Sequence, residues 1–275
     1  MMSHLHHSAS QTFSISGVLI FALLVYLRRW LRLRSHERDK VEGWRAGSFV
    51  SGLLFIWIAT ASPLAELDHE MLTAHMVQHL LLMTLAPPLI LLGIPRKPLA
   101  HGLFHPALFW FAAAATLVVW HIPSVFMLGL QSQMWHEIEQ ASFLVTGLLF
   151  WWPVVQPWPR ASKWPESSIL LYLFLATLPC DILSGFLVFY DRLVYPVFSA
   201  SPRSFGLSAL EDQQCAGALM WTCVTVVYVI AGAVFTASVL SPHRSADQPE
   251  DPAIPQFDSP RIAVRHTDPH RIEVV

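Results

Sequence analysis

The chain carries little charge: Asp, Glu, Lys and Arg make up only 13% of its 275 residues, against about 25% in an ordinary soluble domain. Hydrophobic residues make up 54%. They stand in runs of about 20 residues, the length that a helix needs to cross about 30 Å of hydrocarbon. The runs lack the strict alternation of membrane β-strands. The sequence therefore predicts an all-α, polytopic membrane helix bundle.

Paired cysteines are also lacking. The three cysteines are Cys180, Cys215 and Cys223, and no C-x-x-C pair occurs. This excludes a zinc ribbon, a thioredoxin-type redox centre and the C-x-x-C-H attachment of a c-type haem. The net charge is only −2, and no basic surface of the kind that binds nucleic acid is apparent. Membrane lipid is the expected surrounding, and nucleic acid is not an expected partner.

Seven membrane spans are predicted from the hydrophobic runs. Prolines at positions 87, 88, 153 and 179 fall within or at the ends of spans, where membrane helices tolerate them as kinks. The predicted spans are residues 13–31, 46–63, 72–93, 103–122, 136–153, 168–188 and 212–240.

Basic residues are distributed unevenly over the loops that alternate between these spans. Of the 17 Lys and Arg residues, 15 fall on one side and only Arg192 and Arg203 on the other. Because positive loops stay in the cytoplasm, the N-terminus is expected outside and the C-terminus inside. The expected domains are an extracytoplasmic, His-containing N-terminus (1–12), a membrane domain (13–240) and a disordered, proline-rich cytoplasmic tail (241–275).

Histidines gather at the outward ends of the predicted spans. His75 and His79 stand four residues apart on one face of the span 72–93, close enough to hold one metal ion. Met71 and Met83 extend this pattern by a turn in each direction, and Gln78 could orient an imidazole. Two histidines near a helix end also occur simply as hydrogen-bonding interface residues, so this alternative stays open.

Further polar groups lie at the same predicted depth. His121 ends the fourth span and His136 begins the fifth, with Glu139 one turn later. Asp181 is costly inside an apolar segment, by roughly 2.5–3.5 kcal/mol, and needs an imidazole, a metal or a proton beside it, unless it caps a helix broken after Pro179. Asp212 equally suits the positive end of a helix dipole.

Several motifs carry a resemblance to a known family. They are His75 to Met83 with Ala86-Pro87-Pro88 and Leu92 to Pro95, Trp120-His121-Ile122-Pro123, Gly147 to Pro153, and Asp212 to Gly217 before Met220-Trp221. With these motifs the chain resembles, over about residues 15–240, the seven-helix bacterial assembly factors of caa3-type cytochrome c oxidase (CtaG-like). In that family's pattern the residue after Glu139 is a histidine, whereas this chain has Gln140. The resemblance implies a non-enzymatic protein of the bacterial cytoplasmic (inner) membrane that takes part in oxidase maturation and handles copper.

The resulting hypothesis is an outward cavity that holds Cu(I) and passes it to the apo form of the copper-carrying oxidase subunit. His75 and His79 are the expected primary ligands, His121 or His136 a third, and Met71, Met76 and Met83 soft auxiliary ligands. Residues expected to support these ligands are Gln78, Glu139, Asp181, Asp212, Cys180 and Cys215.

Three other functions remain open on the sequence. Histidines with an acid also suit a seven-helix intramembrane zinc hydrolase, in which zinc activates a water molecule. Histidines on different helices would also ligate b-type haem in an electron carrier. A metal-free scaffold that holds oxidase subunits during assembly is the third alternative.

Overall fold

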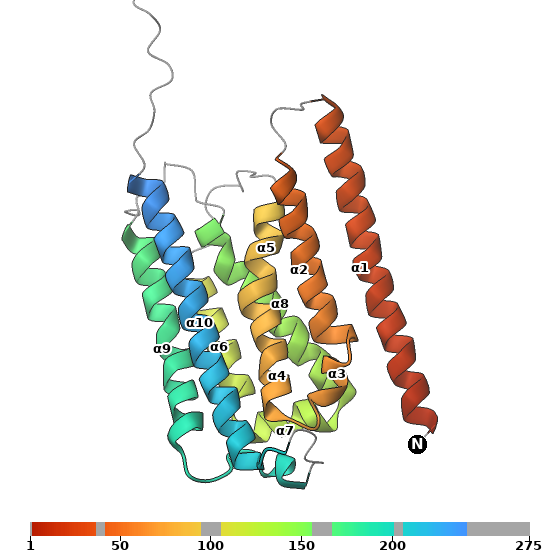
Figure 1. The fold of residues 1–275 in the computed structure, drawn as a ribbon, viewed down its shortest axis with the longest axis vertical. Coiled ribbons are helices and arrows are strands. Elements are labelled where there is room, and N and C mark those ends of the chain that lie inside the picture. The colour runs from red at the N-terminus through yellow and green to blue at the C-terminus, as the bar shows by residue number, and fades with distance from the viewer. Residues whose placement is uncertain (1, 37–41, 95–105, 156–166, 201–205, 241–275) are drawn as a thin grey trace, which may run out of the picture. The chain divides into compact units, whose positions relative to one another are not determined.

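The computed structural model describes residues 2–36, 42–94, 106–155, 167–200 and 206–240, and these contain helices and no strand (Figure 1). Six of the described helical segments are long and apolar enough to cross a membrane, and a bent pair adds a seventh. The helices are α1 (Met2–His36), α2 (Gly43–Ala61), α3 (Leu64–Leu67), α4 (Leu72–His79), the π-helix η2 (Leu80–Leu85), α5 (Ala86–Gly93), α6 (Pro106–Trp120), α7 (Pro123–Gln131), α8 (Gln133–Val155), α9 (Ser167–Phe189), the 3-10 helix η3 (Pro196–Ala200) and α10 (Ala209–Leu240).

The prediction of a polytopic helical membrane protein is confirmed, with six to seven spans. The third predicted span, 72–93, has the bounds of the continuous segment formed by α4, η2 and α5. The expected tail, 241–275, and the loops with Arg96, Lys97, Arg160 and Lys163 lie outside the described residues. The side chains of 1–11, with the N-terminal histidines, are not described either. The orientation of the termini stays a prediction.

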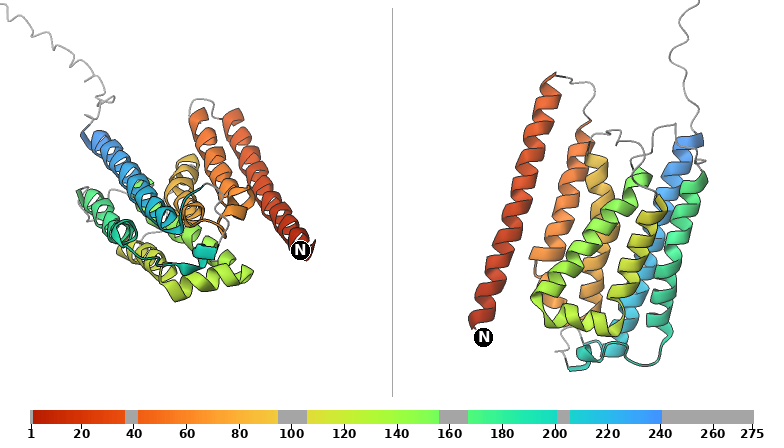
Figure 2. Two further views of the ribbon diagram at one scale, coloured as in Figure 1. Left: turned by 60° about the horizontal axis from the view of Figure 1, so that its bottom comes forward. Right: turned by 180° about the vertical axis from the view of Figure 1, so that it is seen from behind.

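The fourth span is the one that departs from a straight helix. It consists of α6, which ends at Trp120, and α7, which begins at Pro123 and turns away by 78°. Proline at the first position of a helix fixes φ without losing an internal hydrogen bond, so it favours a new helix here. Figure 2 shows that α7 lies across the end of the bundle where α4 and α8 begin. This crossing helix forms a floor under the polar residues of those two helices.

The π-helical turn in the third span follows from its prolines. Pro87 has no amide hydrogen, so the Met83 carbonyl loses its α-helical partner. The indole Nε1 of Trp151 on α8 donates to that carbonyl instead, at 3.1 Å. Within the turn, the amide of Ala86 donates to the carbonyl of Leu81, five residues back. Such turns in membrane helices occur often at functional sites.

Close helix packing depends on two glycines beside this turn. A Cβ at Gly147 of α8 would lie 2.8 Å from the Met83 carbonyl oxygen, and a Cβ at Gly52 of α2 would lie 2.6 Å from Ile90. Helices α8 and α2 therefore approach the third span more closely than any larger residue would permit. Most of the third span is buried, whereas α1 packs mainly on α2, through Tyr26 stacked on Phe49.

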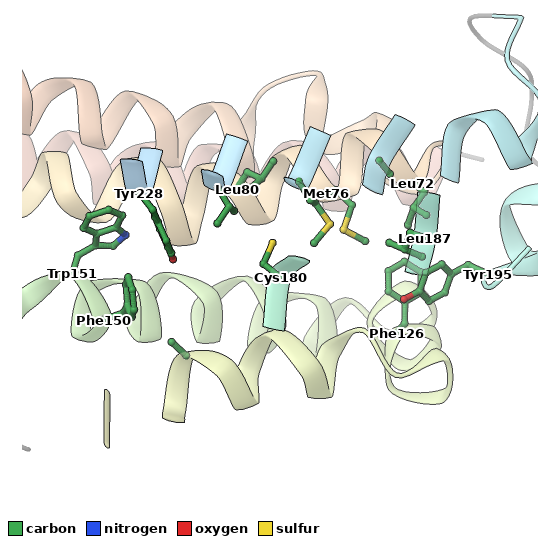
Figure 3. Close-up of a cluster of buried hydrophobic side chains, with 14 of the residues drawn as sticks. Leu72, Met76, Leu80, Phe126, Phe150, Trp151, Cys180, Leu187, Tyr195 and Tyr228 are labelled. Carbon is green, nitrogen blue, oxygen red and sulfur yellow. The ribbon is translucent and has the colours of Figure 1, made fainter. Parts of the chain in front are cut away.

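The buried apolar side chains form two clusters, one on each side of the third span. One lies between α2, α5 and α8. The other joins α4, α6, α8, α9 and α10, and Figure 3 shows many of its residues, among them Leu72, Trp151 and Tyr228. Large apolar residues such as Phe111, Phe174 and Val229 are exposed on the outer faces of the helices, as lipid contact requires.

Candidate metal centre

Two overlapping groups of donor side chains meet at the end of the bundle that α7 covers. The first group is Asp68, His75 and His136, and the second is His75, His79 and Glu139. Within each group, one donor atom per residue lies within 4.8 Å of the others. His75 belongs to both groups. The donors come from three places in the chain: the turn between α3 and α4, helix α4, and the start of α8.

Glu139 stands at the centre of these histidines. Its Oε1 lies 3.4 Å from His75 Nε2 and 3.3 Å from His79 Nε2. Its Oε2 lies 3.5 Å from His136 Nδ1. Gly129 of α7 packs against the same carboxylate, because a Cβ at Gly129 would lie 2.6 Å from Oε2. Helix α7 therefore leaves room for this carboxylate, because residue 129 is a glycine without a side chain.

Asp68 closes the cluster from the side of the α3–α4 turn. Its Oδ2 lies 3.1 Å from His136 Nε2, and its Oδ1 lies 3.6 Å from Nε2 of His69, which is half exposed. Burial, the largest influence, raises the pKa of Asp68, but the close contact with His136 and the nearby charges of His136, His69 and His75 bring the pKa below its ordinary value. The carboxylate is thus held in its charged form, as a metal ligand requires.

The residue at the unusual position, Gln140, also touches the cluster. Its Nε2 lies 2.7 Å from His136 Nε2 and 3.4 Å from the Oε1 of buried Gln78. Gln140 thereby links an imidazole of α8 to an amide of α4. The side-chain amide of Gln140 therefore contacts a donor atom of the cluster. It also carries an oxygen that accepts hydrogen bonds and a nitrogen that donates them.

Most donor atoms of the cluster are buried without a hydrogen-bond partner among the described residues. A buried polar atom left in this way costs about 1–3 kcal/mol, and more if it is charged. A divalent cation would satisfy these atoms together and balance both carboxylates, so the residues fit a transition metal with nitrogen and oxygen ligands. The atoms are both ring nitrogens of His75 and His79 and both carboxylate oxygens of Asp68 and Glu139.

Aromatic rings separate the cluster from the apolar core. Phe143 stacks on the His79 ring with 3.9 Å between centroids, and Phe126 meets the His75 ring edge-on at 4.8 Å. Both phenylalanines are almost fully buried. Rings packed in this way restrict the rotamers of the imidazoles and keep the local dielectric constant low, which strengthens electrostatic interactions inside the cluster.

The histidine predicted at the end of the fourth span lies beside the cluster. The ring of His121 is 5.7 Å from that of His79, centroid to centroid. Its Nε2 lies 3.2 Å from the sulfur of Met76, and its Nδ1 lies 2.7 Å from the Leu117 carbonyl. His121 is therefore a neighbour of His79 that faces sulfur, while the three other predicted histidines face the carboxylates.

The remaining predicted sulfur ligands do not lie among the carboxylates. Met83 belongs to the π-helical turn and lines a cavity with Met76 and Cys180. Met71 is half-buried just before α4, where its backbone carbonyl accepts the His75 amide at 3.2 Å. Cys215 is exposed on α10.

The two predicted aspartates differ in their surroundings. Asp212, at the start of α10, accepts hydrogen bonds from the amides of Leu72 and Thr73 at 2.7 and 3.1 Å. It therefore caps the N-terminus of α4 and holds the helix that carries His75. Asp181 is half-buried on α9, and its Oδ1 has no hydrogen-bond partner among the described residues.

Sequence reasoning did not single out Asp68, His69 or Gly129. Asp68 and His69 stand in a connecting turn, where a charged pair looks like an ordinary interface residue pair. Their position directly before a span with two histidines was the available signal. Gly129 gave no signal, because its importance comes from α7, a helix that follows the predicted end of the fourth span.

Comparison with known proteins identifies the family. No curated protein matches the chain. No solved structure matches it either. The sequence model of the cytochrome c oxidase caa3 assembly factors (Caa3_CtaG) matches residues 24–241, which include every residue of the cluster and nearly all of the described helices. The match confirms the resemblance seen in the motifs and supports a role in oxidase assembly, and the chain therefore belongs to the cytochrome c oxidase caa3 assembly factor family.

Proposed function

We propose that this assembly factor binds copper in the cluster of Asp68, His75, His79, His136 and Glu139 and passes it to the apo form of the copper-carrying oxidase subunit. The observation that carries the proposal is the pair of donor groups that share His75, each with its donor atoms within 4.8 Å of one another. Family membership supplies the context of oxidase assembly, and a copper enzyme cannot mature without a supply of the metal.

The donor atoms indicate which form of the metal this cluster favours. Three imidazoles and two carboxylates suit Cu(II), and they suit zinc as well. Cu(I), the form expected from the histidine and methionine pattern, prefers sulfur. Sulfur is available on the neighbouring face of α4, at Met76.

A row of imidazoles offers a route for the ion. His69 is half exposed, and its ring lies 5.7 Å from that of His136. The ring of His136 lies 6.0 Å from that of His75, which lies 4.4 Å from that of His79. Neighbouring ligands at such distances let an ion move by exchanging one ligand at a time. On the predicted topology, His69 opens to the outer side of the membrane.

The direct test compares two glutamates of one helix. Glu139 is fully buried in the cluster, while Glu137, two residues earlier on α8, is exposed. Purified wild-type protein loaded with Cu(II) should keep it through a wash with a mild chelator, and Glu139→Gln should lose it while Glu137→Gln keeps it. In cells that lack the chromosomal copy, only the Glu137→Gln protein should restore the oxidase spectrum.

Two results would overturn this proposal. Cu(II) retention equal to that of the wild type in the Glu139→Gln, His75→Ala and His79→Ala proteins would show that Cu(II) is held elsewhere. A wild-type protein that binds no metal, yet restores the oxidase, would leave the metal-free scaffold as its function.

The carboxylates also favour a second candidate, the intramembrane zinc hydrolase. Glu139 stands 3.3–3.5 Å from three imidazoles, a position from which a carboxylate can serve as ligand or as general base. Zinc instead of copper on elemental analysis, with amide or ester turnover that Glu139→Gln abolishes, would favour this candidate.

A further inference from the structure

A second set of donor atoms lies on the other side of α4. Met76 follows His75 directly, so its side chain leaves the helix about 100° away and packs in the apolar cluster to which α6, α9 and α10 contribute. Met76 is completely buried, and its sulfur lies 3.2 Å from the Nε2 of His121, which is 5% exposed. A nitrogen and a sulfur from different helices thus meet inside the bundle.

The proton position on His121 makes this contact unusual. Its Nδ1 lies 2.7 Å from the Leu117 carbonyl oxygen, which can only accept a hydrogen bond, so Nδ1 carries the proton. In the neutral ring, Nε2 then presents a lone pair to a thioether sulfur, which is itself a lone-pair donor. Two lone pairs facing each other gain nothing by themselves. They are, however, the donors that a soft cation requires.

The backbone of His121 is fixed from a further direction. The hydroxyl of Tyr195 donates to the His121 carbonyl oxygen at 2.7 Å, just where α6 bends into α7. The imidazole is consequently held in place beside Met76.

Sulfur atoms line the cavity that begins at Met76. Its volume is about 40 Å³, which exceeds the space that one water molecule needs, so an ion fits. Figure 3 shows Cys180 reaching from α9 toward Met76. His79, a donor of the carboxylate cluster, also lines the cavity and so borders both sets of donors. The sulfur-bearing lining residues are Met76, Met83, Cys180 and Met220.

We propose that His121 and Met76 form a second metal site, at the edge of this sulfur-lined cavity, that takes a soft monovalent cation of the Cu(I) class. The site is separate from the carboxylate cluster and differs from it in preference. Sulfur and imidazole suit Cu(I), while carboxylate and imidazole suit Cu(II) or zinc. Because His79 borders both, an ion can move from one site to the other along the imidazole row.

Silver(I), a soft monovalent ion that does not oxidise, is the probe. Purified full-length protein in detergent should bind silver, and Met76→Leu should weaken that binding by at least about tenfold. The matched control is Met134→Leu, because Met134 is 60% exposed on α8 and does not line this cavity. Glu139→Gln should lose the cluster's zinc or Cu(II) and keep its silver. Equal silver affinity in Met76→Leu and wild type would overturn the second site, as would loss of silver in Glu139→Gln.

X-ray absorption of the Cu(I)-loaded wild-type protein provides a second readout. Sulfur scattering in the copper shell supports the second site, and a shell of nitrogen and oxygen alone overturns it. The failures of the two proposals are distinguishable. If the carboxylate cluster binds no metal, zinc and Cu(II) binding are absent while silver binding still depends on Met76.

Discussion

Two neighbouring regions of one helix differ in the donor atoms that they gather. Toward α8 and the α3–α4 turn, His75 and His79 meet two carboxylates. Toward α6, α9 and α10, Met76 meets an imidazole and a sulfur-lined cavity. Helical geometry separates the regions, because consecutive residues point about 100° apart. One span thus offers nitrogen and oxygen ligands on one side and sulfur ligands on the other.

The largest expected effect comes from removing His75, the residue that belongs to both sets of donors in the carboxylate cluster. His75→Ala should lower the affinity for zinc or Cu(II) by roughly a hundredfold or more, because losing a direct ligand weakens metal binding more than losing a residue that only orients a ligand. Metal content after a chelator wash measures this. His121→Ala should leave zinc or Cu(II) bound and lose silver. If His121→Ala loses both kinds of ion to the same degree, the two regions are a single site.

A smaller effect is expected at the floor helix. Gly129→Ala would place a Cβ 2.6 Å from Oε2 of Glu139, so the carboxylate must move although no donor is lost. Affinity for zinc or Cu(II) should fall by about tenfold, with silver affinity unchanged. Gly185→Ala on α9 is the control, because a Cβ there meets nothing within 4 Å. Equal affinities in the two alanine variants would show that Glu139 tolerates displacement.

The smallest effect on metal binding should be equal at the carboxylate cluster and at the Met76 site. Asp212 caps α4, which carries His75 and Met76 alike. Asp212→Ala should lower stability by about 1–2 kcal/mol and weaken zinc and silver binding by similar factors. Thermal unfolding in detergent and the two affinities measure this, with exposed Asp191→Ala as the control. A selective loss of one ion would mean that Asp212 acts on one region directly and not through the helix.

Much of the fold followed from the hydrophobic pattern. Hydrophobic runs predict spans well because the cost of exposing backbone in lipid leaves few alternatives to a helix. The bend after Trp120 escaped prediction: the fourth span was extended to residue 122 and α7 was not foreseen, although Pro123 marks its start. Since α7 carries Gly129 and Phe126, the sequence-based prediction lacked the helix that covers the candidate metal site.

The sequence predicted most residues of the candidate site, but it predicted less of how they are arranged. A spacing of four placed His75 and His79 on one face, and the structure brings both to Glu139. The same spacing extended the stripe to Met83, but the π-helical turn begins right after His79 and changes the phase of the following residues. Residue spacing could not predict the position of Asp68, because Asp68 lies in a turn and a turn has no periodicity that predicts where its side chains point.

The wide turn at Leu80–Leu85 also sets how this span tolerates change in length. Its hydrogen bond spans five residues instead of the four of an α-helix, so losing one residue there would restore ordinary winding and leave the flanking faces in place. Deleting a residue such as Val77, which lies in the α-helical part of the span, would not be compensated in this way. It would swing His75 by about 100° relative to Ile90, which is fitted against Gly52. Deletion of a single residue should therefore be accepted only within this segment of the span.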